Sequence, residues 1–260
     1  MKNKNKTVLK SIDLLKLFLT NAKLNLNEMV ELSGIPKTSI HRMAGSLEEM
    51  GFLERNEEGK YSLGLLFLQL GEIVKERLDI RDAALPTMKN LRDDIGEAVN
   101  LIIKDGNEAI YIEKVDTMHP VRLYTKIGRR SPLYAGACSR ILLAFLPDYE
   151  QEQYLNDIEL KPIGFGTITD KEKLRNALGE SRKNGYAVSF SELENYTAAL
   201  AAPIFDYTGS VAAGISIAGP EHRYRDDLLP DLVEKVIKAA NEISQKLGWR
   251  EANKLSYNLS

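Results

Sequence analysis

One stretch near the N-terminus limits the fold of this chain more than any other: two short helical segments separated by a turn and followed by a compact hairpin. Asn27 is a suitable N-cap for the first helix, and Asn25 with Glu28 forms an alternative capping-box register. Gly34 suits the left-handed end of this helix, and Pro36 suits the first turn of the next. This order is typical of a winged helix-turn-helix, whose second helix is shaped to enter a DNA major groove.

The second of these helices is predicted to have one apolar side and one polar side. Its inward stripe repeats at helical spacing and consists of Ile40, Met43, Ala44 and Leu47. The side chains expected to face outward in its first two turns are Lys37, Thr38, Ser39, His41 and Arg42. Lys, Thr and Ser contact phosphates as well as bases, and Arg42 is the best candidate for bidentate recognition of guanine.

A β-hairpin follows and forms the predicted wing. Residues 52–55 and 60–63 are its strands, and residues 56–59 are its turn. Arg55 and Lys60 are expected to lie along a phosphate backbone. The alternative is a helix-turn-helix used only for packing or dimerisation, with the charges as a solvated face. The agreement of turn glycine, helix-start proline, small polar residues and basic wing favours DNA binding.

Composition places the chain among ordinary globular proteins. Its 260 residues suit two domains, with 43% apolar and 28% charged residues. We expect a cytoplasmic protein without a membrane segment, because no apolar run approaches ~20 residues and the basic start leads into no signal-peptide core. A net charge of −2 argues against indiscriminate coating of nucleic acid; residues 1–60 carry 10 basic against 8 acidic side chains, an excess that supports DNA binding only weakly.

A predicted linker helix follows the wing. Residues 63–74 are apolar almost all round, so this helix needs a partner surface. It can pack against the following helix, over about residues 81–95, or against the same helix of another subunit. We favour dimerisation, because a single helix-turn-helix contacts few base pairs. The expected division is a winged domain at 1–63, a linker helix at 64–79 and a second domain at 80–260.

The second domain is predicted to be α+β, with a sheet and flanking helices. Hairpins are expected from residues 98–103 with 109–113 and from 198–205 with 211–218, and a further strand from 121–124. Helices are expected at 137–146, 148–156, 171–184 and 226–247.

A ligand pocket is predicted where residues 134–139 enter a helix. Small residues there let a ligand approach the backbone, and free N–H groups at a helix start attract carboxylates. Strand serines can donate hydroxyl hydrogen bonds, although strand packing or turn bonding is an equally good explanation of each. The predicted ligand-binding residues are Leu123, Ala137, Cys138, Ser189, Ala199, Ser216 and Ala218. The nearby basic residues that favour a small carboxylate ligand are Arg122, Lys126, Arg129 and Arg130.

Cys138 is the lone cysteine and therefore forms no internal disulfide, which fits a reducing compartment. A thiol at a helix start can have a lowered pKa and be reactive, but a small buried hydrophobe is the favoured interpretation. The three histidines, His41, His119 and His222, have no spacing typical of a metal site, so neither metal nor cofactor is expected.

Two sets of residues resemble one known family. Residues 36–43 and 47–53 look like the recognition-helix region of IclR-type bacterial transcription regulators, and residues 185–187, 201–206 and 215–220 resemble the signature of that family's C-terminal domain. The resemblance covers essentially the whole chain. It implies a GAF-like effector-binding domain and dimers, with tetramers as a further state. Some relatives carry an acidic residue and a cysteine where this chain has Ser189 and Ala199.

The favoured hypothesis is a ligand-responsive transcription regulator of a catabolic or metabolite-use operon, a repressor rather than an activator. Its expected partners are double-stranded operator DNA, a small-molecule effector and further copies of itself, as a homodimer or a dimer of dimers. One alternative is an enzyme that uses Cys138 as a nucleophile, which would need a base that no motif supplies. Another is a protein-interaction module.

Overall fold

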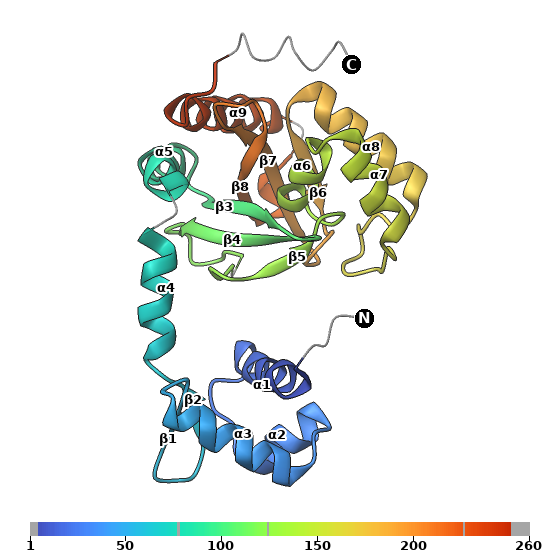
Figure 1. The fold of residues 1–260 in the computed structure, drawn as a ribbon. Helices are drawn as coiled ribbons and strands as arrows, with labels where there is room; N and C mark the ends of the chain where they lie inside the picture. The colour runs from blue at the N-terminus through green and yellow to red at the C-terminus, as the bar shows by residue number, and fades with distance from the viewer. Residues whose placement is uncertain (1–4, 77–78, 124, 226, 251–260) are drawn as a thin grey trace. The chain divides into compact units, whose positions relative to one another are not determined.

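The N-terminal unit contains the predicted helix-turn-helix and hairpin. The computed structural model describes residues 5–76, 79–123, 125–225 and 227–250, and the chain divides into two units, Met1–Leu78 and Asp79–Ser260. Along the first unit lie α1 (Lys6–Lys16), a 3₁₀ turn η1 (Leu17–Leu19), α2 (Leu26–Ser33), α3 (Lys37–Glu49), β1 (Leu53–Arg55), β2 (Tyr61–Leu63) and α4 (Leu66–Glu76) (Figure 1).

Local capping explains where α2 and α3 begin and end. Asn25, not Asn27, caps α2: the Asn25 side chain accepts from the Glu28 N–H at 3.1 Å, and the Glu28 carboxylate accepts from the Asn25 N–H at 2.7 Å. The first expectation was wrong and the capping box is confirmed, because only the Asn25 register satisfies two N–H groups reciprocally. Gly34 ends α2 at φ +66°. Pro36 lies one position before α3, and its carbonyl accepts the first hydrogen bonds of that helix.

The core of this unit lies between α3, the earlier helices and the hairpin. The four residues of the predicted inward stripe of α3 are all buried. They pack with Leu14, Met29, Leu53 and Tyr61, which come from α1, α2 and the two strands. An isolated bridge between Leu24 and Tyr61 ties the segment before α2 to the hairpin. The hairpin therefore has a fixed place beside α3, as a wing requires.

The second unit is a six-stranded antiparallel sheet covered by helices on both faces. Its strands are β3 (Ala98–Asp105), β4 (Glu108–Val115), β5 (Arg130–Pro132), β6 (Ala187–Phe190), β7 (Thr197–Phe205) and β8 (Val211–Pro220), in the spatial order β5-β4-β3-β8-β7-β6. Its helices are α5 (Asp79–Ile95), α6 (Ala137–Ala144), α7 (Asp148–Asp157), α8 (Lys171–Asn184), the short η2 (Glu221–Arg223) and α9 (Leu229–Lys246). The α+β prediction is confirmed.

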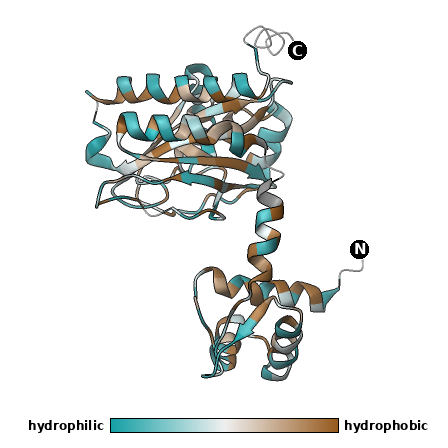
Figure 2. Ribbon diagram, turned by 90° about the vertical axis from the view of Figure 1, so that its left-hand side faces the viewer, coloured by the Kyte–Doolittle hydropathy of each residue, from teal (hydrophilic) through white to brown (hydrophobic). Residues whose placement is uncertain are grey.

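Helix α6 packs on the sheet together with α8, and α5 packs with α9. In Figure 2 the helices that cover the sheet alternate between hydrophilic and hydrophobic segments, as amphipathic helices do. The cluster under α6 includes Ile102, Tyr111, Cys138, Ile141 and Leu142, all buried. This is the face of the sheet on which the predicted pocket residues meet. None of the helices that the structure describes is long and apolar enough to cross a membrane.

One predicted strand was wrong. Residues 121–123 form no strand, Tyr124 lies outside the described residues, and the edge strand is instead β5, which pairs with β4 through Ala109 and Ser131. The apolar residues at 121 and 123 have strand propensity, but no neighbouring strand edge receives them. Two helix boundaries also differ: α6 ends at Ala144, and α9 begins at Leu229, while residue 226 lies outside the described residues.

Candidate DNA-binding surface and ligand pocket

The polar face of α3 is open to solvent. Lys37, Thr38, His41 and Arg42 are exposed and Ser39 is half-buried. No acidic residue lies in the first turn, and within the described residues neither Lys37 nor Arg42 takes part in an ion pair. The buried apolar stripe fixes α3 in place, and the polar side chains project from the opposite side of the helix into solvent. Their contact with DNA remains a prediction.

The wing presents its two basic residues differently. The guanidinium of Arg55 lies over the ring of Tyr61, 5.6 Å from the ring centroid. Lys60 Nζ is 3.7 Å from the carboxylate of Glu58, and Asn56 closes the turn by accepting from the Lys60 N–H at 2.9 Å. An exposed ion pair of this kind contributes little, so Lys60 can exchange Glu58 for a phosphate at small cost.

A small cavity of about 30 Å³ lies in the second unit, where the sequence places a ligand pocket. Five of the predicted residues line it: Leu123, Cys138, Ser189, Ala199 and Ala218. The other lining residues are Tyr111, Arg129, Gly136, Glu192, Leu193, Glu194, Thr197 and Ala198. The two remaining predicted residues contact this wall: the Ala137 N–H donates to Ser189 Oγ at 2.9 Å, and Ser216 Oγ lies 2.8 Å from Cys138 Sγ.

The expectation of free N–H groups at the start of α6 was wrong for two of them. The Gly136 N–H donates to the Glu192 carboxylate at 2.7 Å, and the Ala137 N–H is taken by Ser189. Glu192 is buried and also pairs with Arg140, whose guanidinium donates to the Val188 carbonyl. The chain therefore supplies its own anion at this helix start. Glu192 belongs to no local motif, so only the fold reveals this role.

Arg129 is the basic residue of the predicted four that lines the cavity. Its Nη1 is 2.6 Å from Glu194 Oε1, and its guanidinium lies 6.0 Å from the ring centroid of Tyr111. The others lie elsewhere: Arg130 pairs with Asp105 and Glu108, Arg122 lies 3.6 Å from Asp116, and Lys126 is exposed. A carboxylate that entered the cavity would therefore meet one cation, already partnered by a half-exposed glutamate.

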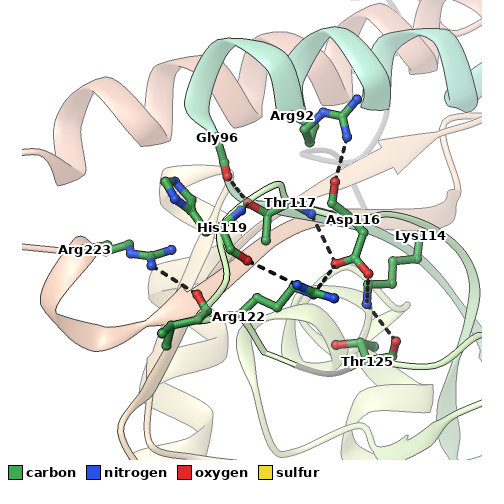
Figure 3. Close-up of polar contacts among 10 residues, drawn as sticks. Arg92, Gly96, Lys114, Asp116, Thr117, His119, Arg122, Thr125 and Arg223 are labelled. Atoms are coloured by element: carbon green, nitrogen blue, oxygen red, sulfur yellow. Dashed lines mark hydrogen bonds and ion pairs between the residues drawn. The ribbon is translucent and has the colours of Figure 1, made fainter.

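The segment between β4 and β5 contributes Leu123 and Arg129 to the cavity, and side chains hold it by its backbone carbonyls. Figure 3 shows three arginines that reach these carbonyls. The hydrogen bonds run from Arg92 to Asp116 O at 2.7 Å, from Arg122 to His119 O at 3.3 Å, from Arg223 to Val121 O at 3.1 Å and from Lys114 to Thr125 O at 3.0 Å. We call residues 116–123 together with Thr125 the covering loop. It is held chiefly by polar contacts, since Met118 and Val121 are 89% and 64% exposed.

The surroundings of Cys138 oppose a nucleophilic role. Burial raises the pKa of its thiol above the ordinary value, and the hydrogen bond to Ser216 only partly offsets this effect. His41 belongs to the other unit, His119 packs against Gly96, and His222 is exposed in η2. Among the described residues, no group of three or more His, Cys, Asp or Glu side chains is arranged to hold a metal ion.

We expect Cys138 to resist thiol reagents in the native protein. At pH 8 a disulfide reagent should label the folded chain slowly, and the unfolded chain rapidly with one equivalent, because the chain has one cysteine. The raised pKa also means that this thiol supports the fold below about pH 9 and that its contribution falls as pH rises further. Rapid labelling of the native protein would contradict the buried, protonated state.

Comparisons with known proteins agree over most of the chain. The IclR helix-turn-helix domain matches residues 7–57, and the bacterial transcriptional regulator IclR C-terminal domain matches residues 73–245. The HTH-type transcriptional regulator KipR of Bacillus subtilis is 60% identical over 249 residues, which cover 96% of this chain and 100% of that protein. The transcriptional repressor IclR of Escherichia coli is 29% identical, covering 88% of this chain and 85% of that one. A Microbacterium hydrocarbonoxydans IclR homologue, solved as a complex with 4-hydroxybenzoate, has a TM-score of 0.81 and 25% identity, covering 93% of this chain and 99% of that one.

Proposed function

Because this chain belongs to the IclR family of bacterial transcriptional regulators, we propose that it is a cytoplasmic repressor whose affinity for operator DNA is changed by a small carboxylate effector. The observation that carries the proposal is the exposed polar face of α3 above its buried apolar stripe. The repressor role is supported by the 29%-identical E. coli repressor. The working division is a winged domain at 1–63, a linker helix at 64–79 and an effector-binding and oligomerisation domain at 80–260.

DNA contact is assigned to the first two turns of α3 and to the wing. Arg42 recognises base edges, and Lys37 supplies charge to phosphates or bases, with Thr38, Ser39 and His41 beside them. Arg55 and Lys60 follow the backbone next to the major groove. The support for these roles is exposure, charge and position on one anchored helix and one closed hairpin.

Self-association is supported by apolar surface on α4. The residues concerned are Leu65, just before α4, and Leu68, Leu70 and Ile73 within it, which are 68%, 63%, 43% and 48% exposed. Exposed apolar side chains cost free energy in water, and a second copy packed on α4 removes them from solvent. Pairing also supplies the second helix-turn-helix that a two-half-site operator needs. We assign a homodimer through α4, with a dimer of dimers as the larger assembly.

The carboxylate class rests on Arg129. A carboxylate can take over the guanidinium from Glu194, whose pair with it is only partly buried. The 4-hydroxybenzoate bound by the Microbacterium homologue carries such a group. Because about 30 Å³ has room for roughly one water molecule, the cavity must enlarge to accept an effector. A coupling of about 1–3 kcal/mol between this change and the winged domain would alter operator affinity roughly 5- to 150-fold.

Replacement of Arg129 by Ala should abolish the response to a carboxylate. The control Arg130→Ala removes an exposed cation outside the cavity and should leave this response unchanged. The measurement is release of labelled operator by a panel of small carboxylates that includes 4-hydroxybenzoate. A response in Arg129→Ala equal to that of the wild type would show that this guanidinium does not receive the effector.

The experiment that tests the whole proposal is selection of genomic fragments on the purified full-length chain. We expect a few fragments with paired half-sites, bound in the absence of effector and released by a carboxylate from the panel. Release supports repression relieved by the effector, and tighter binding would support the opposite sign. Retention of no fragment at moderate salt would overturn DNA binding and favour a protein-interaction role for the winged domain.

A further inference from the structure

Asn100 is a buried side chain whose hydrogen-bonding capacity is unused. It lies in the central strand β3, and its relative exposure is 1%. Neither its amide nitrogen nor its amide oxygen has a hydrogen-bond partner. Buried polar groups in proteins are nearly always paired, because an unmade bond costs the full desolvation of the group.

The strand register places Asn100 on the face of the sheet that carries the cavity. Asn100 is opposite Ser216 on β8, and Ser216 bonds Cys138 in the cavity wall. The next row on the same face runs through Ala98, Ala218 and Ala199, of which the last two line the cavity. Directly opposite residues share a face, and diagonal neighbours lie about 7–8 Å apart. Asn100 is therefore a diagonal neighbour of Ala218, which lines the cavity.

Lys114 connects this place to the covering loop. Lys114 is opposite Asn100 on β4, and its ammonium donates to Thr125 O at 3.0 Å and lies 3.1 Å from Asp116 Oδ2. Both partners, Asp116 and Thr125, belong to the covering loop. Displacement of this loop would enlarge the cavity on the side of Asn100. Met118 and Val121 of this loop are exposed rather than packed, so its displacement would break chiefly polar contacts.

We propose that Asn100 is a specificity-determining residue for the effector, and that it pairs with a carboxamide at the end of the ligand opposite the carboxylate held by Arg129. A carboxamide supplies a donor and an acceptor side by side and satisfies both atoms of the Asn100 amide. A carboxylate satisfies only the nitrogen and leaves the amide oxygen facing another acceptor. An alkyl group satisfies neither. This inference rests on the proposed effector function and names the effector's second polar group.

The test compares two ligands of the same shape on three proteins. The ligands are succinamate, which has a carboxylate and a carboxamide, and 4-methylpentanoate, in which the carboxamide is replaced by an isopropyl group. The proteins are the wild type, Asn100→Leu and the control Asn90→Leu, which changes an exposed residue of α5. Binding is measured by calorimetry, and thermal stability is measured without ligand.

The wild type and Asn90→Leu should both prefer succinamate, and Asn100→Leu should bind it about tenfold more weakly and lose the preference. Without ligand, Asn100→Leu should melt a few degrees higher, because an unpartnered buried amide is replaced by an apolar side chain of similar size. Unchanged succinamate binding in Asn100→Leu would overturn the proposal. A lower melting temperature would also overturn it, since Asn100 would then be needed for the fold.

Ligand binding and operator release together separate this inference from the proposed function. If neither ligand binds the wild type while other carboxylates release the operator, the carboxamide assignment is wrong and the regulator stands. If no carboxylate binds and no operator is found, the effector function itself fails, and Asn100 loses its assigned role.

Discussion

Replacing Arg42 by Ala is expected to weaken specific operator binding by about 1–3 kcal/mol, roughly 5- to 150-fold, and to relax the base preference at one position of each half-site. The reason is geometric. Arg42 lies in the second turn of α3, exposed and without an ion pair, on a helix fixed by Ile40, Met43 and Ala44. The measurement is fluorescence anisotropy with the selected operator and with single-base variants at one fixed salt concentration.

Lys16→Ala is the matched control for this prediction. Lys16 lies in the same unit, 63% exposed, with its ammonium 3.4 Å from Asp13 in the last turns of α1. This change removes the same charge as Arg42→Ala and should leave base preference intact. Equal losses in the two variants would reduce the Arg42 effect to general electrostatics. Intact affinity and preference in Arg42→Ala would mean that α3 does not read the operator through this residue.

The largest loss of stability is expected from Glu192→Gln. Glu192 is 6% exposed, pairs with the buried Arg140 and accepts from the Gly136 N–H at the start of α6. Glutamine keeps the shape but leaves the Arg140 guanidinium as an uncompensated buried charge. Removing one member of such a pair costs about 3–5 kcal/mol of unfolding free energy. Urea unfolding of the full-length protein, followed by circular dichroism, measures this change.

Glu194→Gln provides the comparison two residues further along the chain. Its carboxylate pairs with Arg129, but its side chain is 41% exposed, so solvent screens the interaction. We expect a loss of at most about 1 kcal/mol. Similar losses of unfolding free energy in Glu192→Gln and Glu194→Gln would show that burial does not strengthen the Arg140–Glu192 pair. An unchanged free energy of unfolding in Glu192→Gln would mean that the pair does not hold α6 to the segment after β6.

Local signals predicted the winged domain well because each of its features acts over a few residues. The glycine at φ +66° that ends α2, the apolar stripe of α3 and the closed hairpin all follow from sequence spacing. Even the N-cap of α2 was limited to two candidates, Asn25 and Asn27, which lie two positions apart. Only the reciprocal bond from Glu28 decided it.

Only some residues of the ligand pocket could be predicted from the sequence. The helix-start signal identified Cys138, the strand serines identified Ser189, and the apolar or small walls identified Leu123, Ala199 and Ala218, all of which line the cavity. Glu192 was missed, because its role depends on Arg140 and Gly136, which are more than 50 positions away. The strand predicted at 121–124 failed for a related reason: propensity acts on single residues, whereas a strand needs an available edge. The arginines that hold the covering loop come from α5, from the loop itself and from η2, and no spacing rule joins them.

The sequence by itself determined the two helices of the helix-turn-helix and the two faces of α3, because these depend on contacts within about four residues. Tertiary structure alone decided that Glu192 occupies the start of α6, that Arg129 meets Glu194 across the cavity and that Asn100 lies unpaired behind it. These arrangements join charges and polar groups from distant strands. Their energies depend on burial and partners, which only the folded chain brings together.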